Sequence, residues 1–125
     1  MKVHESAENY LETILILQQR MGAVRSIDIA NELEYSKPSV SIAMRHLREE
    51  QLISVDSSGY ITLLPKGKAI AELIFERHEL LTSWLVTLGV PKDIAAEDAC
   101  RIEHVISEES FEALKLHAHK GKECL

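Results

Sequence analysis

Three side chains that can bind a metal ion lie on one short segment, "EDACRIEHVISEES", as Cys100, Glu103 and His104. Successive residues of a helix are rotated by about 100°, so positions i, i+3 and i+4 share one face. The apolar Ala99 and Ile102 fall on a different arc and can serve the core. A thiolate, a carboxylate and an imidazole suit a first-row transition metal, whereas calcium and magnesium prefer oxygen ligands alone. The spacing is equally compatible with the polar border of an amphipathic helix.

Three ligands on one turn do not complete a coordination sphere, so a metal site needs donors from other segments. Two segments offer them: "SAENYLETI" contains Asn9 and Glu12, and "FERHELL" contains His78 beside Glu79. A site assembled from these residues would connect the two halves of the chain, so that metal binding could order or orient the first half. The alternative is that His78 and Glu79 form a surface pair and that Glu12 only solvates its helix.

The charge of the chain is unevenly distributed. The 125 residues include 46% hydrophobic side chains, enough for one core or two small cores packed together. The formal net charge of −6 argues against a uniformly basic nucleic-acid binder. However, residues 36–68 carry five Lys and Arg against three Asp and Glu, whereas residues 76–125 carry six against ten. The acidic second half could concentrate a cation, and the first half is compatible with DNA.

The first part of the sequence predicts three helices. Apolar residues at helical spacing run from residue 6 to 19 and end at Gly22. A short second helix begins with Ser26 as its N-cap, and a third begins with Ser36 as its cap and Pro38 in its first turn. The predicted buried residues of these helices are Leu11, Ile14, Leu15, Leu17, Ile29, Ala30, Leu33, Val40, Ala43, Met44 and Leu47.

Two β-branched segments, "LISVD" and "YITLL", flank the turn "SSG", where Gly59 can take a left-handed conformation. Three helices followed by such a hairpin are the order of a winged helix-turn-helix, whose third helix enters the major groove of DNA. The alternative is a winged-helix module that contacts only protein. The predicted DNA-contacting residues are Ser36, Lys37, Pro38, Ser39, Ser41 and Arg45.

The rest of the sequence predicts three further helices, at about 65–88, 92–106 and 108–118, the last capped by Ser107. The first of them carries an apolar stripe of Ile70, Leu73, Ile74, Leu81, Trp84, Leu85 and Leu88. A helical domain this small has little core without a partner, so Trp84, Leu85, Leu88 and the last two helices serve either a dimer interface or the intramolecular core.

We therefore expect a mainly α fold with two domains. Residues 1–64 form the winged helix-turn-helix, and residues 65–125 form a helical domain whose tail, from about 119, is frayed. Glutamates interrupt the apolar residues at the start of the chain, and no apolar run has the length of a membrane span. These features predict a cytoplasmic protein without a membrane partner. Cys100 and Cys124 are expected to remain thiols.

Four stretches of the sequence, "DACRIEHVIS", "RHELL", "SAENYLETI" and "SKPSVS", resemble the diphtheria-toxin-repressor (DtxR/MntR) family of metal-dependent transcriptional regulators. The resemblance runs from about residue 5 to 118. It implies an N-terminal winged helix-turn-helix and a helical dimerisation domain, with Fe(II) or Mn(II) bound between them as co-repressor. The length resembles the shorter, manganese-sensing branch without an SH3-like domain, whereas the cysteine resembles the iron-sensing branch.

The resemblance also implies a ligand set. Position by position, the implied metal ligands are Glu12, His78, Cys100, Glu103, His104 and Asn9. Asn9 stands where the family usually has Asp or Met, and its amide oxygen is a neutral, weaker donor. Because a thiolate prefers Fe(II) over Mn(II), we favour Fe(II), and we expect Zn(II) or Co(II) to bind in vitro.

The expected function is a homodimeric, metal-activated repressor of iron or manganese uptake genes. It would bind palindromic double-stranded operator DNA and would have no enzymatic activity and no small-molecule substrate. One alternative is a winged-helix regulator with a non-metal effector, whose DNA affinity would not respond to EDTA. Another is a small metalloenzyme that uses Glu103 as a base, but nothing in the sequence resembles a nucleophile or a phosphate loop.

Overall fold

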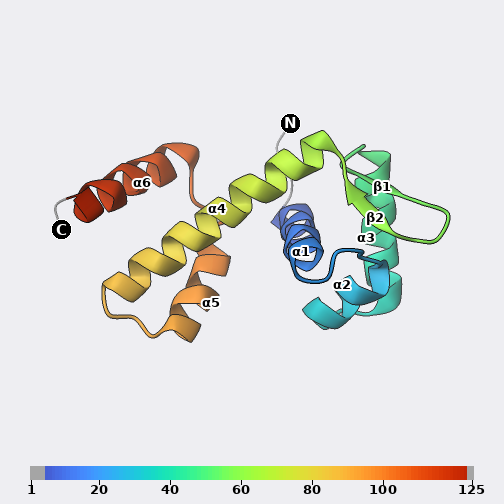
Figure 1. Cartoon of the computed structure of the whole chain (residues 1–125), viewed down its shortest axis with the longest axis horizontal. Coiled ribbons are helices and arrows are strands. Elements are labelled where there is room, and N and C mark those ends of the chain that lie inside the picture. The colour runs from blue at the N-terminus through green and yellow to red at the C-terminus, as the bar shows by residue number, and fades with distance from the viewer. Residues whose placement is uncertain (1–4, 124–125) are drawn as a thin grey trace. The chain divides into compact units, whose positions relative to one another are not determined.

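The structure is a computed structural model that describes residues 5–123, with the backbone alone for residues 119–123 (Figure 1). The described elements are α1 (Glu5–Met21), α2 (Ser26–Leu33), α3 (Lys37–Glu49), β1 (Ile53–Val55), β2 (Ile61–Leu63), α4 (Pro65–Thr87), α5 (Lys92–Ile102) and α6 (Glu108–Glu123). They form two compact units that divide after Leu73, and α4 contributes to both units. This order of three helices, a wing and further helices confirms the predicted mainly α fold class.

The first unit is a helix-turn-helix whose wing is anchored to the helices. Helix α1 contacts α2 and β2, α2 contacts α3, and α3 contacts β1. The two strands are antiparallel, with Ile53 opposite Leu63, and Val24 forms a further bridge to Ile61. The buried apolar residues of this unit are Leu11, Ile14, Leu15, Leu17, Val24, Ile29, Ala30, Val40, Met44, Leu47, Leu52, Ile53, Ile61 and Ala71. Leu33 and Ala43, which we also assigned to this core, are only partly buried.

The turns of the first unit follow the predicted chemistry, with one correction. Gly22 and Gly59 take positive φ values of 83° and 87°, which glycine adopts without strain. The Ser36 side chain accepts a hydrogen bond from the Ser39 amide at 3.3 Å, which confirms Ser36 as the cap of α3. The cap of α2 is Arg25 and not Ser26. The reason is the aspartate three positions after Arg25, whose carboxylate accepts the Arg25 amide at 2.9 Å.

The start of α4 packs closely on the end of the helix-turn-helix. A Cβ atom added at Gly67 would lie 2.1 Å from the carbonyl oxygen of Leu52. The same carbonyl accepts the Leu64 amide at 3.0 Å, so it cannot easily move away. A glycine is therefore required at this position of α4.

The second unit consists of the rest of α4 with α5 and α6. Its buried apolar residues are Ile74, Leu81, Ala95, Ala99 and Phe111. Ser107 caps α6 as predicted, since its hydroxyl accepts the Ser110 amide at 3.1 Å. Lys115 of α6 donates a hydrogen bond to Glu76 of α4, and this bond raises the pKa of Lys115.

Three expectations for the helices need correction. Helix α5 ends at Ile102 and not at 106, and α6 continues to Glu123, beyond the predicted end at 118. Leu88, expected in the apolar stripe, is 63% exposed, and Leu73 is also exposed. Cys124, in the predicted tail, lies outside the described residues. Among residues 5–123, no helix has the length and apolar character needed to cross a membrane.

Candidate metal centre

Glu103 and His104 directly follow α5 instead of lying inside it. The Glu103 amide still donates to the Ala99 carbonyl at 2.9 Å, and the Glu103 backbone stays helical (φ −58°, ψ −25°). The amides of residues 105 and 106 both donate to the Ile102 carbonyl at 3.0 Å, which closes a turn and stops the helix. Because Glu103 keeps helical geometry, it remains close to Cys100 even though the predicted helix end was wrong.

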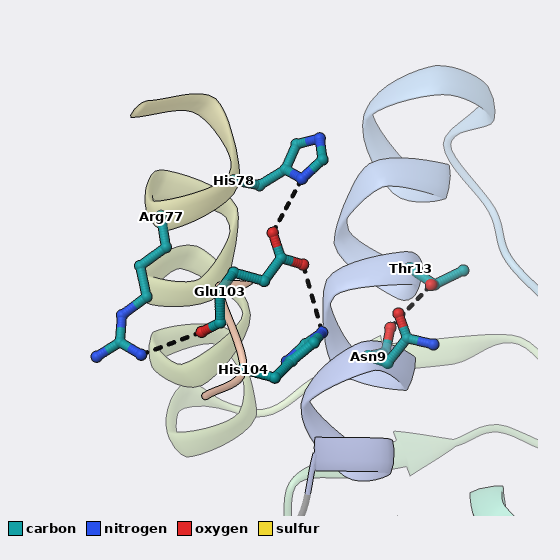
Figure 2. A network of polar contacts seen from close by, with 6 residues as sticks. All are labelled: Asn9, Thr13, Arg77, His78, Glu103 and His104. Atoms are coloured by element: carbon teal, nitrogen blue, oxygen red, sulfur yellow. Dashed lines mark hydrogen bonds and ion pairs between the residues drawn. The ribbon is translucent and has the colours of Figure 1, made fainter. Parts of the chain in front are cut away.

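The carboxylate of Glu103 lies between two imidazole rings (Figure 2). Its Oε2 atom is 2.9 Å from Nδ1 of His78, which α4 contributes, and its Oε1 atom is 3.3 Å from Nε2 of His104. The side chain of Glu103 is 0% exposed, that of His104 is 3% exposed and that of His78 is 24% exposed. A carboxylate buried to this extent is costly unless cations or hydrogen-bond donors compensate it.

The donor atoms of the predicted segment converge. One ligand atom each of Cys100, Glu103 and His104 lies within 4.8 Å of the others, and Cys100 is the exposed member. The Oε1 atom of Glu103 is buried and has no hydrogen bond in the described part of the chain. A thiol sulfur, an oxygen of a buried carboxylate and an imidazole nitrogen fit a transition-metal ion and do not fit calcium or magnesium.

The two predicted ligands on α1 belong to the first unit. Glu12 is buried on α1, and Asn9 lies one turn before it and is partly buried. The Asn9 carbonyl accepts the hydroxyl of Thr13 at 2.8 Å, so the backbone of Asn9 is held while its side-chain amide extends separately (Figure 2).

Arg77 is a member of this network that the sequence did not reveal. Its Nη1 atom donates to the carbonyl oxygen of Glu103 (Figure 2). The same atom donates to the Ile106 carbonyl, and the residue is buried. The only signal in the sequence was its place immediately before His78 in "FERHELL". Periodicity could not have distinguished it from an exposed helix arginine.

The six residues predicted to contact DNA share the exposed side of α3 and its cap. Ser36, Lys37, Pro38, Ser39, Ser41 and Arg45 are all exposed. Arg45 lies 4.0 Å from Glu49 in an exposed i, i+4 pair, an interaction too weak to fix its position. At the wing, the Asp56 carboxylate accepts the amides of Ser58 and Tyr60, both at 2.9 Å, and this shapes the tight turn.

Comparison with known proteins assigns both parts of the sequence. Residues 2–61 match the family described as "Iron dependent repressor, N-terminal DNA binding domain", and residues 64–125 match "Iron dependent repressor, metal binding and dimerisation domain". The transcriptional regulator MntR of Escherichia coli O6:H1 is 33% identical over 116 residues, which cover 93% of this chain and 75% of that protein. The iron-dependent repressor IdeR of Mycobacterium leprae is 33% identical over 106 residues, covering 84% of this chain and 46% of IdeR.

A solved structure supports the same relationship. The manganese regulator SloR superposes with a TM-score of 0.80 at 28% identity, over 95% of this chain. The matched region is 55% of that solved chain, so the present chain spans about half the length of SloR.

The winged helix-turn-helix, the helical unit and the relatives together define a class of protein, the metal-dependent transcriptional regulators. Since the two matches extend over almost all of the sequence, the chain belongs to the iron-dependent repressor family. This confirms the family resemblance read from the sequence. The relatives are regulators, which confirms the expectation that the chain is not an enzyme.

Proposed function

We propose that this chain is a homodimeric repressor that acts in the cytoplasm, binds operator DNA when Fe(II) or Mn(II) occupies the centre around Glu103, and controls metal-uptake genes. The observation that carries the proposal is the buried Glu103 carboxylate, with His78 and His104 at its two oxygens and the Cys100 thiol nearby. Folded proteins seldom bury such a set without a ligand or a function for it.

The proposed ligands are His78, Cys100, Glu103 and His104, completed by Glu12 and Asn9 from α1. The four residues of the second unit supply sulfur, nitrogen and oxygen donors, and the family resemblance supplies the reason to add the two residues of α1. A bound divalent ion would supply the positive charge that offsets the buried carboxylates. Asn9 would be the weakest ligand because its amide oxygen is neutral.

This ligand set would couple metal binding to DNA binding. We assign DNA binding to residues 1–64 and metal binding with dimerisation to residues 65–125, and α4 begins at the boundary between the two, at Pro65. Ligands drawn from both parts would favour one arrangement of the chain over others when metal is bound. Such a shift of populations is sufficient to raise the affinity for an operator.

The DNA interface in this proposal is the exposed side of α3, with the "SSG" wing near phosphate. Its members are Ser36, Lys37, Pro38, Ser39, Ser41 and Arg45. The small hydroxyl side chains allow close approach to base edges, and Lys37 and Arg45 supply positive charge.

The proposed dimer would use exposed apolar residues of the second unit. These are Val86, Leu88, Ile94, Val105 and Leu116. A two-fold axis through such an interface would present two copies of α3 to a palindromic operator.

The proposed metal is Fe(II) in preference to Mn(II), because Cys100 offers a thiolate and thiolates favour the softer ion. Zn(II) and Co(II) are expected to bind in vitro as well. The relatives include both an iron-dependent repressor and a manganese regulator, which is consistent with either ion.

A DNA-shift titration tests the proposal. The chain is mixed with its own promoter region under anaerobic conditions and titrated with Fe(II), Mn(II) or Zn(II), with EDTA as the control. We expect the shift to require metal and to be reversed by EDTA. A shift that EDTA does not change would contradict metal activation and would favour a non-metal effector.

A further inference from the structure

The environment of Arg77 is unusual for a charged side chain. The residue is 9% exposed, and its Nη1 atom donates to the Glu103 carbonyl at 3.1 Å and the Ile106 carbonyl at 3.3 Å. Its guanidinium carbon lies 5.4 Å from the centroid of the Phe111 ring. The Glu103 carbonyl at the C-terminal end of α5, the further carbonyl of Ile106 and the face of the Phe111 ring all attract a cation, so they compensate its burial.

The two carbonyls bound by Arg77 enclose the turn that carries the candidate metal ligands. Glu103 is the first residue of this turn, His104 follows it, and Ile106 lies near its end. His78, the next residue of α4 after Arg77, is 2.9 Å from the Glu103 carboxylate. Consecutive residues of α4 thus hold the backbone and the side chain of the same glutamate (Figure 2).

We propose that Arg77 is a positioning residue for the metal centre: by holding residues 103–106 on α4, it sets the place of the Glu103 carboxylate and the His104 ring relative to His78. The proposal rests on the metal site of the proposed function. Its physical basis is that the geometry of a metal site depends on the groups that orient the ligands, and removing such a group typically lowers metal affinity by about 10- to 100-fold.

The contact between Arg77 and Phe111 also connects residues 103–106 to the first turn of α6. The aromatic ring is 1% exposed and lies beside the guanidinium. A change in the position of residues 103–106 would therefore move Arg77 and, through its contact with Phe111, alter the packing of α6. Substitution of Phe111 by leucine keeps an apolar group but removes the ring face, and we expect a smaller loss of metal affinity than for Arg77 itself.

The test compares metal binding by the full chain and three variants. In R77M the apolar stem remains and the donors are lost, whereas in R77K the charge remains but the planar fork is lost. The matched control is R101M, because Arg101 is an exposed arginine of α5 that pairs with Glu97 at 3.2 Å and has no hydrogen bond to the 103–106 turn. Mn(II) affinity is measured by calorimetry at low temperature, after circular dichroism has shown that each protein is folded.

We expect R77M to bind Mn(II) roughly 10- to 100-fold more weakly than the wild type, R77K to lie between them, and R101M to stay within about twofold. The visible absorption of bound Co(II) provides a second readout, since it reports ligand geometry and not overall stability. We expect altered bands in R77M and R77K and unchanged bands in R101M.

Unchanged affinity and unchanged Co(II) bands in folded R77M overturn the positioning role and leave the proposed function intact. If R77M does not fold, R77K decides by the same two measurements. An equal loss in R101M also overturns the role, because it would show a general effect of charge. Failure of the wild-type chain to bind any metal overturns the proposed function together with this inference.

Ile42 carries a second inference, on a separate observation. It is an apolar residue on the outer side of α3, yet it is 51% exposed. Ser39 and Arg45 lie three residues before and after it, so they share its face, and both are exposed. A branched apolar side chain in the middle of a polar recognition face is placed to contact an apolar group on the DNA.

We infer that Ile42 contacts the C5-methyl group of a thymine in the operator, an inference that rests on the proposed DNA binding. The thymine methyl is the main apolar group that base pairs present in the major groove, and apolar side chains read it by direct contact. Ser39 and Arg45 would meet the polar edges beside it. This contact would make the protein select operators that have thymine at one position in each half-site.

Replacement of single thymines by uracil tests this contact, because it removes only the methyl group. The operator is first selected from random duplexes with the Mn(II)-loaded chain, and each thymine is then replaced in turn. We expect one position per half-site at which uracil weakens wild-type binding by about fourfold. This is the change in affinity expected for the loss of one buried methyl group. The I42A variant should lose this discrimination, whereas I27A, which removes an exposed isoleucine of α2, should keep it.

Wild-type binding that no uracil replacement weakens overturns the thymine contact. Discrimination that persists in I42A overturns the assignment to Ile42. If the selection enriches no sequence, the proposed operator binding itself fails, which is a different result from either of these.

Discussion

The exposed side of α3 and the candidate metal centre are both composed of polar side chains, but water reaches all of the first and only the Cys100 and His78 edge of the second. Ser39, Ser41 and Arg45 keep their hydration in the folded protein, whereas Glu103 and His104 are almost fully buried. Exposed polar groups affect stability little, and buried ones must be compensated by hydrogen bonds or charge. Substitutions in α3 should therefore change DNA binding, while substitutions at the centre should change metal binding and, with it, the stability of the metal-bound form.

The largest effect is expected for Glu103→Gln. The amide keeps the shape of the side chain but removes the buried charge, so metal affinity should fall by at least about 100-fold. At a metal concentration 100 times the dissociation constant, the wild type gains about 2.7 kcal/mol from binding, and a variant that binds about 100-fold more weakly should keep only about 0.4 kcal/mol of it. Thermal unfolding with Mn(II) and with EDTA measures both values.

The metal-free Glu103→Gln protein should unfold at the same temperature as the metal-free wild type or at a higher one. A neutral amide avoids the cost of a buried carboxylate, so the loss should be confined to the metal-bound form. Glu97→Gln is the control because Glu97 is an exposed glutamate of α5. A metal-induced stabilisation equal to that of the wild type would show that Glu103 is not a ligand.

A smaller effect is expected for Cys100→Glu, which exchanges the exposed sulfur donor for an oxygen donor. Because oxygen ligands suit Mn(II) better than thiolate does, the preference for Fe(II) over Mn(II) should fall by about tenfold. The measurement is the concentration of each ion that activates DNA binding under anaerobic conditions. Equal activation thresholds for the two ions in both proteins would contradict this role of Cys100.

Ser36→Ala should separate the structural role of the α3 cap from the metal centre. The Ser36 hydroxyl accepts the Ser39 amide, and loss of such a cap costs about 1 kcal/mol of stability. Urea unfolding of the metal-free chain measures this loss, with Ser41→Ala, also exposed on α3, as the control. Mn(II) affinity should not change, and a large change would argue against the independence of the two regions.

The smallest effect is expected for Lys37→Ala. Loss of one phosphate contact should weaken binding to all DNA sequences by a similar factor and reduce the salt dependence of the affinity by about one unit of slope. Titrations at several salt concentrations measure the slope. Lys92→Ala, at the exposed start of α5, removes the same charge and should leave the slope unchanged. A lower slope in Lys92→Ala would show that the contact surface is not limited to α3.

Local signals predicted most of the fold. Gly22 and Gly59 take the positive φ values expected at their turns, and Ser36 and Ser107 cap the helices that follow them. These features depend on residues only a few positions apart, so sequence patterns report them directly. The apolar stripe of α1 was predictable for the same reason.

The predictions were wrong where a neighbouring side chain or a distant segment determines the local structure. Helical periodicity continues through Glu103, and no glycine or proline marks the end of α5, so the turn at Ile102 had no local signal. Arg25 caps α2 because an aspartate reaches back to its amide. Leu88 continues the apolar spacing of α4, but the structure leaves it exposed.

The sequence by itself determined the order of the elements, the positions of Cys100, Glu103 and His104 on one turn, and the family, because each depends on residue types and short spacings. Only the tertiary structure decided that His78 meets the Glu103 carboxylate and that Arg77 holds the Glu103 backbone, across 25 and 26 residues of chain. The physical reason is that such contacts depend on how α4 packs against the end of α5. Periodicity specifies which face of a helix is apolar, but it does not specify which polar residue at its border will be buried.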